Sequence, residues 1–143
     1  MIGPDGTSVG IDLSTIQTPC YFLATRDDHI APWHAVLTST TLVSGPVKFV
    51  LAGSGHVAGV INPPQRKKYG YLTNTSKTAD AQTWREGAVQ NSGSWWPDWG
   101  KWSAHHAGAK NTPARVPGDG KLKALGNAPG NYVKIRADDL STS

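Results

Sequence analysis

Two short apolar runs separated by a helical pattern constrain the fold of this chain more than any other feature. The first run covers Cys20 to Ala24 and the second covers Val47 to Leu51. Between them, Pro32 stands where a first helical turn begins, and apolar residues then recur at spacings of three and four, which predicts a helix of about ten residues. This order predicts a β-α-β unit, with two parallel strands joined by a right-handed crossover helix.

The ends of the two predicted strands carry the candidate site. Asp27 and Asp28 follow the first strand, and His56 follows the second strand after a Gly-Ser-Gly loop. Because the carboxyl ends of parallel strands meet at one edge of a sheet, we expect the acid and the histidine to lie one or two strand spacings of ~4.8 Å apart. In that arrangement the acid accepts a hydrogen bond from the imidazole, and the other ring nitrogen is left free as a general base.

A nucleophile for this pair is not evident in the sequence. The G-x-[S/C]-x-G box of a nucleophile elbow is absent, because Ala52 and His56 occupy the positions of "AGSGH" that require glycine. Cys20, the single cysteine, lies inside the first predicted strand without flanking glycines, and we interpret it as a small buried hydrophobe. One cysteine also excludes an internal disulfide and fits a reducing compartment.

The remaining segments predict a core region followed by a tail. Residues 1–10 are Gly-rich and polar, which predicts a flexible N-terminal end. Residues 62–74 predict a loop and residues 78–91 a helix. After Lys110 the chain is rich in Gly, Pro and Lys, so we expect residues 111–143 to form an extended basic tail with one short strand at 132–136.

A third predicted helix covers the segment "SWWPDWGKWSAHHAGA". Its spacing places three tryptophans and one histidine on a single face. We interpret this face as one that packs the helix onto the core, with contact to a polymer or a partner as the alternative. The members of the face are Trp95, Trp99, Trp102 and His106.

Charge and composition exclude several classes of function. Fourteen Lys and Arg against ten Asp and Glu give a formal charge of +4, but the one basic run, at residues 65–70, is best interpreted as a solvated loop. No zinc-finger, RNP or helix-turn-helix pattern is present, so we expect no nucleic acid as partner. The start lacks the pattern of a secretory signal and no apolar run approaches ~20 residues, so we expect a cytoplasmic protein without a membrane span. His105 and His106 lack a third ligand nearby, so we expect no metal site.

Three motifs together resemble a known family. "DLSTIQTPCYFLATRDDHIAPW", "FVLAGSGHVAGVINPP" and "GSWWPDWGKW" are similar to the C-terminal part of the class I polyhydroxyalkanoate (poly-3-hydroxybutyrate) synthases, and the resemblance covers about residues 11–135. It implies the C-terminal fragment of an α/β-hydrolase fold, with the last parallel strands and their crossover helix, then C-terminal helices and an extended tail. Residues 11–110 would be the C-terminal part of the catalytic domain.

The resemblance also implies an activity. Such an enzyme is an acyltransferase that takes (R)-3-hydroxyacyl-CoA, transfers the acyl group to a cysteine and extends a polyester chain with release of CoA. It needs no cofactor, because the CoA thioester is the substrate. The partners implied are the substrate, the growing polyester, a second copy in a homodimer of the full-length enzyme, and the polyester granule surface in the cytoplasm.

The family motifs assign roles to individual residues. The motif R-[ED]-D-H-I-A-P-W places the catalytic aspartate on Asp28, and G-H-[IV]-A-G-V-I-N places the histidine on His56, which would deprotonate the cysteine or the 3-hydroxyl of the substrate. His29 would line the substrate pocket or make a structural hydrogen bond, and Asp27 would be a solvated loop acid. The family's cysteine lies upstream of the matched motifs, so we expect the isolated chain to be inactive.

Two other functions stay open at this point. One is a non-catalytic association module that docks on a synthase subunit or a polyester granule through the tryptophan face. The other is a hydrolase of the same fold with an unorthodox nucleophile. Because a sheet cut before its central strands exposes apolar edges, we also expect the isolated chain to be marginally stable or prone to aggregate.

Overall fold

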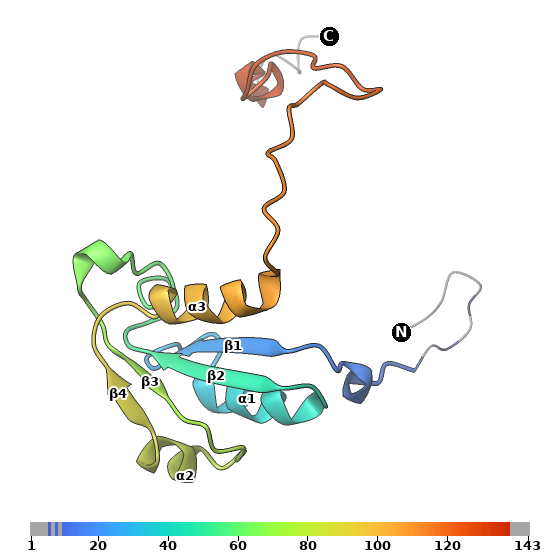
Figure 1. Ribbon diagram of the computed structural model, residues 1–143. Helices are drawn as coiled ribbons and strands as arrows, with labels where there is room; N and C mark the ends of the chain where they lie inside the picture. Colours follow the sequence, from blue (N-terminus) through green and yellow to red (C-terminus); the bar gives the residue numbers. More distant parts are fainter. Residues whose placement is uncertain (1–5, 7, 9, 138–143) are drawn as a thin grey trace. The chain divides into compact units, whose positions relative to one another are not determined.

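The computed structural model describes residues 6, 8 and 10–137, and a four-stranded mixed sheet organises the described part of the unit that ends at Gly108 (Figure 1). Its strands lie in chain order across the sheet: β1 (Cys20–Thr25), β2 (Val47–Ala52), β3 (Tyr71–Thr73) and β4 (Val89–Asn91). β1 and β2 are parallel, whereas β3 runs antiparallel to β2 and β4 antiparallel to β3. The predicted pair of parallel strands is confirmed. The predicted flexible end at residues 1–10 lies largely outside the described residues.

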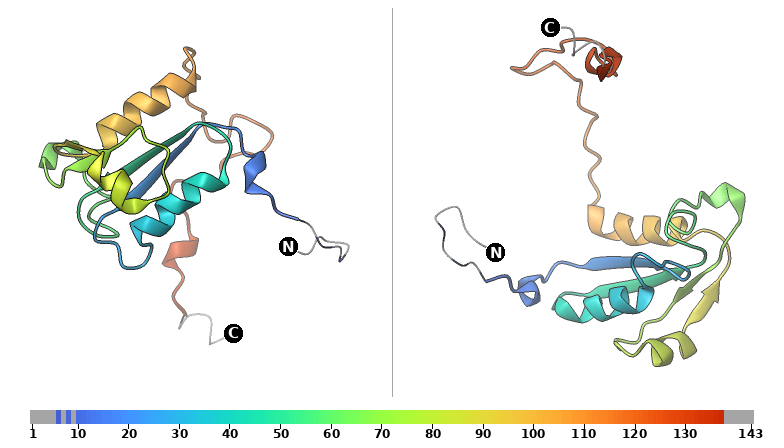
Figure 2. Two further views of the ribbon diagram at one scale, coloured as in Figure 1. Left: turned by 90° about the horizontal axis from the view of Figure 1, so that it is seen from below. Right: turned by 180° about the vertical axis from the view of Figure 1, so that it is seen from behind.

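Helices cover both faces of this sheet. α1 (Trp33–Ser39) connects β1 to β2 and continues into a 3-10 turn at Thr40–Leu42, which confirms the predicted helix of about ten residues. α3 (Trp96–Ala107) lies on the opposite face from α1, and α2 (Ala81–Glu86) lies on the α1 side next to β3 and β4 (Figures 1 and 2). No helix among the described residues is long and apolar enough to span a membrane.

The core lies between the sheet and the layer of α1 and α2. Alternate residues of a strand point to opposite faces of the sheet, so every second residue of β1 and β2 enters this core. Phe49 packs edge-on against Trp84 with ring centroids 4.9 Å apart. The buried members of the cluster are Ala24, Trp33, Leu37, Phe49, Leu51 and Trp84.

The opposite face of β1 and β2 contacts α3 through polar and aromatic side chains. Tyr21 of β1 and Lys48 of β2 are partners in the strand register and contact Asp98 of α3. The Tyr21 hydroxyl donates to one Asp98 carboxylate oxygen at 2.9 Å, and the Lys48 ammonium group lies 2.7 Å from the other. The Tyr21 ring also contacts that of Trp102, with centroids 5.4 Å apart.

The predicted helix at residues 78–91 is wrong in its second half. α2 begins after Asp80, whose carboxylate accepts from the Thr83 N–H at 2.8 Å, and it ends at Glu86 with Gly87 as its C-cap. The residues that follow leave the helix and form β4, which pairs with β3. Glycine is a poor helix former and Val89 is β-branched, so pairing with an available strand outweighs the continuation of the helix.

Two other segments also differ from the prediction. The expected loop at residues 62–74 contains β3, a strand of only three residues, and a 3-10 turn at Pro64–Arg66. The expected strand at 132–136 is wrong, because Tyr132–Lys134 form a 3-10 turn in which the Ile135 N–H donates to the Tyr132 carbonyl. Residues 109–137 belong to a unit of their own, and the described residues of this unit contain no strand. A strand at 132–136 would therefore have no partner in this unit for its backbone hydrogen bonds. A further 3-10 turn covers Leu13–Thr15.

Candidate active site

The turn after β1 holds Asp28 in place through its own backbone. The Asp28 N–H donates to the Thr25 carbonyl at 3.3 Å, which closes the turn. One carboxylate oxygen of Asp28 accepts from the backbone N–H groups of Ile30 and Ala31, both at 2.9 Å. Short polar side chains often bond to the backbone in this way ahead of a helix, and α1 begins shortly afterwards. One oxygen is thereby committed to the turn, and the other is free to bind a second group.

The loop after β2 carries His56 on a compact turn. The Gly59 N–H donates to the Gly55 carbonyl at 2.9 Å, and the Ile61 N–H donates to the Val57 carbonyl at 2.8 Å. Gly59 lies in close contact with neighbouring segments, because a Cβ atom there would come within 2.6 Å of the Gly53 carbonyl oxygen and of the Thr25 methyl group. The loop is therefore closed against the end of β1, where Asp28 is placed.

Asp28 and His56 form a direct contact. His56 Nδ1 lies 2.8 Å from Asp28 Oδ2, a distance typical of a charge-assisted hydrogen bond. The Asp28 side chain is 7 % exposed, whereas that of His56 is 49 % exposed. The hydroxyl oxygen of Thr25 lies 3.4 Å from the same carboxylate oxygen. The predicted positions of the two residues are confirmed: the acid and the histidine meet at the carboxyl edge of the parallel strand pair.

The electrostatics of the turn keep Asp28 ionised. The Ala31 N–H contributes most, followed by the hydrogen bond from His56, and together with the Ile30 N–H they lower the pKa of Asp28 to about 2. Near neutral pH the carboxylate is charged and accepts only, so the proton in this contact resides on His56 Nδ1. His56 Nε2 has no hydrogen-bond partner among the described residues, and it is left to accept a proton from a group at the surface.

The other sequence candidates lie apart from this pair. His29 is exposed, and its side chain makes no hydrogen bond to the rest of the described chain, so its predicted contact with substrate stays a prediction. Asp27 is exposed and forms an ion pair with Arg26 at 2.9 Å, in agreement with a solvated loop acid. Cys20 is half-buried at the first position of β1, at the opposite end of the strand from Asp28. The strand puts about 17 Å between that end and the turn, at about 3.3 Å per residue, so Cys20 is out of reach of His56.

Sequence reasoning missed two groups that contact the histidine loop. The indole N–H of Trp95 donates to the Gly59 carbonyl at 3.1 Å, and that of Trp96 donates to the Val60 carbonyl at 2.9 Å. The helical pattern indicated that the tryptophans pack onto the core. Trp95 and Trp102 do pack inward, but against Tyr21 on the α3 face of the sheet, which is opposite the buried core cluster. Trp99 is 48 % exposed. Nothing in the spacing of the tryptophans indicated which carbonyl groups they would reach.

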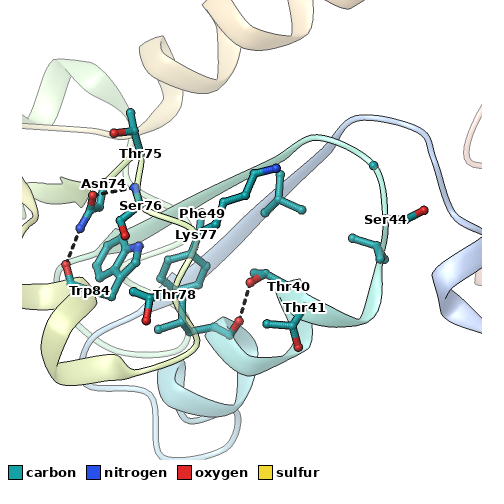
Figure 3. Close-up of a pocket in the computed structure, with 14 residues that line it drawn as sticks. Thr40, Thr41, Ser44, Phe49, Asn74, Thr75, Ser76, Lys77, Thr78 and Trp84 are labelled. Carbon is teal, nitrogen blue, oxygen red and sulfur yellow. Dashed lines mark hydrogen bonds between the residues drawn. The ribbon is translucent and has the colours of Figure 1, made fainter.

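A separate pocket lies on the α1 side of the sheet (Figure 3). Its volume is about 180 Å³, and Phe49, Leu37 and Trp84 contribute its apolar wall. Thr40 and Thr41, directly after α1, and Ser76 and Thr78, before α2, add hydroxyl-bearing side chains to its lining, and Lys77 is the charged residue there. Neither Asp28 nor His56 contributes to this lining. The pocket is therefore distinct from the acid–histidine pair.

The fold and the site together define a chain of the α/β class with a carboxylate–imidazole pair at the edge of its parallel strands. No protein-family model matches the chain. Curated proteins do: the chain is 45% identical over 129 residues to the poly(3-hydroxyalkanoate) polymerase subunit PhaC of Cupriavidus necator, covering 90% of this chain and 22% of the relative. It is 44% identical over 127 residues to the PhaC subunit of Rhizobium meliloti, covering 89% and 20%. It is also 44% identical over 131 residues to the poly(3-hydroxyalkanoate) polymerase of Methylorubrum extorquens, covering 91% and 22%.

These matches confirm the resemblance drawn from the three motifs: by sequence, the chain is related to the poly(3-hydroxyalkanoate) polymerases. The chain spans about a fifth of the length of the curated relatives it matches. The relation covers nearly all of the chain, so both strand ends and the tryptophan helix belong to a part that it shares with polymerases.

Proposed function

We propose that this chain supplies the acid and the base of a polyester synthase, an acyltransferase that polymerises (R)-3-hydroxyacyl-CoA. The observation that carries the proposal is the 2.8 Å contact between Asp28 and His56 at the ends of two adjacent parallel strands, in a chain related to poly(3-hydroxyalkanoate) polymerases. We further propose that the sheet is the C-terminal portion of an α/β-hydrolase fold, and that the cysteine nucleophile comes from outside residues 1–143.

The proposed reaction uses His56 twice. In the first step His56 Nε2 takes the proton of the cysteine thiol, and the thiolate attacks the thioester carbonyl. The bond to the CoA sulfur breaks, and the imidazolium returns its proton to CoA as it leaves. In the second step His56 takes the proton of a 3-hydroxyl group, whose oxygen attacks the acyl-cysteine to form the new ester, and the proton passes to the released cysteine. Asp28 holds Nδ1 protonated throughout and stabilises the imidazolium.

A chimera tests this proposal. This chain would replace the matched 129 residues of the Cupriavidus necator relative, and CoA release from (R)-3-hydroxybutyryl-CoA would be measured. We expect release by the chimera and none by the isolated chain. His56→Gln and Asp28→Asn should abolish release, whereas Asp27→Asn, a matched change at the exposed neighbouring acid, should retain it. Release by the isolated chain, or an active His56→Gln chimera, would contradict the proposal.

The remaining parts of the proposal concern partners and location. We place the assembled enzyme in the cytoplasm at the surface of a polyester granule, as a homodimer. The alternative of a docking module through the tryptophan face has less support, because Trp95 and Trp102 pack on Tyr21 and only Trp99 of the predicted face is substantially exposed among the tryptophans. Exchange of Trp95 for alanine would disturb the packing of α3, so Trp99→Ala alone is the clean test of docking.

A further inference from the structure

The turn that carries His56 ends in backbone carbonyl groups that need partners from elsewhere. Its internal hydrogen bonds, from Gly59 to Gly55 and from Ile61 to Val57, follow the pattern of a helical turn. The last carbonyls of such a turn find no donor within it and must be satisfied from outside. The donors here are two neighbouring indoles, because Trp95 binds the Gly59 carbonyl and Trp96 binds the Val60 carbonyl.

The helix that supplies these indoles is tied to the two strands whose ends form the site. Tyr21 of β1 and Lys48 of β2 both bind Asp98, in the first turn of α3, at 2.9 and 2.7 Å. The Tyr21 ring also lies against Trp95, with centroids 6.2 Å apart. Since Tyr21 and Lys48 are register partners, the same strand pair fixes α3 and carries Asp28 and His56 at its far end. The indole donors and the acid are therefore held in one frame.

The imidazole of His56 makes few contacts of its own that fix its position. Its side chain is 49 % exposed, and its one hydrogen bond within the described chain is the contact with Asp28. The position of the ring therefore depends on where the loop backbone places it, and proton transfer is sensitive to displacements of that backbone by fractions of an ångström. A group that fixes the end of the loop acts on the ring without touching it.

From these contacts we propose that Trp95 and Trp96 are positioning residues for His56, which they fix by capping the carbonyl end of its loop. This proposal rests on the proposed function for its catalytic meaning, but the positioning is a property of the chain that is measurable without any reaction. It assigns a role to the indole N–H groups of Trp95 and Trp96 that is separate from the packing of the Trp95 ring on Tyr21.

The direct test removes the N–H groups and keeps the shape of the rings. In the 143-residue chain, Trp95 and Trp96 would each be replaced by 3-benzothienylalanine, in which sulfur stands in place of the indole N–H. The readout is the exchange of the His56 Nδ1 proton with water, followed by NMR of the nitrogen-labelled chain. A hydrogen bond contributes about 1 kcal/mol, so we expect exchange to accelerate about fivefold for each replacement, and more for both. The same replacement at Trp102, whose N–H makes no hydrogen bond within the described residues, should leave the exchange unchanged.

Two results would overturn the positioning role: an unchanged exchange rate in the doubly replaced chain, or an equal acceleration on replacement of Trp102. A parallel measurement of CoA release in the chimera, carrying Trp95→Phe with Trp96→Phe, separates this inference from the proposed function. Faster exchange with full CoA release supports the positioning and contradicts the catalytic role of His56. Lost release with unchanged exchange contradicts the positioning. Faster exchange together with a lower kcat at an unchanged KM supports both.

Discussion

Gly59→Ala should destabilise the chain by an amount that follows from the closeness of its surroundings. A Cβ atom at this position would lie 2.6 Å from both the Gly53 carbonyl oxygen and the Thr25 methyl group, about 0.8 Å closer than the 3.4 Å at which ordinary contact begins. Neither neighbour can yield easily, because Thr25 is 1 % exposed and the Gly53 N–H is bonded to the Gly70 carbonyl at 2.9 Å. The loop must therefore move away from β1.

Such a movement has two costs. Overpacking a closed site costs about 1–3 kcal/mol, and the displaced loop weakens the hydrogen bond that Gly59 donates to Gly55, which contributes about another 1 kcal/mol. We therefore expect a loss of about 2–4 kcal/mol in the free energy of unfolding, measured by urea denaturation with tryptophan fluorescence and circular dichroism.

Gly55→Ala in the same loop is the matched control. A Cβ atom at Gly55 would meet the Asp27 carbonyl oxygen at 3.6 Å, an ordinary contact, so its unfolding free energy should change by less than about 1 kcal/mol. Equal stability of the two variants would show that the close approach at Gly59 does not exist in solution, and the placement of His56 against β1 would lose its support.

The contacts of Asp28, Tyr21 and Trp84 support three further predictions. The pKa of Asp28 is depressed to about 2 from an ordinary 3.8, so its contribution to stability is present above about pH 4 and is lost as the pH falls toward 2. Asp28→Asn should therefore flatten the decline in unfolding free energy over that pH range. An unchanged slope would refute the contact between Asp28 and His56. Tyr21→Phe removes the hydroxyl that donates to Asp98 and should lower the free energy of unfolding in urea by about 1–3 kcal/mol. Because burial raises the pKa of Tyr21, removing this tyrosine should leave the tyrosinate absorbance that develops near pH 10 unchanged. A smaller absorbance change in the variant would show that Tyr21 is accessible. Trp84→Ala should lower the free energy of unfolding by about 3–5 kcal/mol, because Trp84 lies in the core and is 1 % exposed. Trp99→Ala should lower it far less, because Trp99 is 48 % exposed. Similar values for the two variants would contradict the described packing.

The parallel strand pair and the acid–histidine contact could be predicted because their signals are local. Each strand is a continuous apolar run, and each functional residue follows its strand within a few positions, so the topology alone brings Asp28 to His56. No knowledge of side-chain packing was needed for that step.

The missed elements depend on partners far along the chain. β3 and β4 have three residues each, and their pairing decides their structure more than their own sequence does. The apolar spacing that predicts a helix continues past Gly87 to Val89, and only the presence of β3 shows that the helix ends before it. The indole contacts of Trp95 and Trp96 likewise join segments whose approach depends on how α3 docks, which a period of three and four residues does not encode.

The indole contacts with the histidine loop have a consequence for the order in which the chain is made. Thirty-six residues separate each loop carbonyl from the tryptophan that binds it. At about 5–20 residues per second, a ribosome takes about 2–7 s to add that stretch after the loop has been synthesised. During this interval β1, α1 and β2 have already been synthesised, but the loop lacks its last two donors. The site thus matures late in synthesis, after the sheet that carries it.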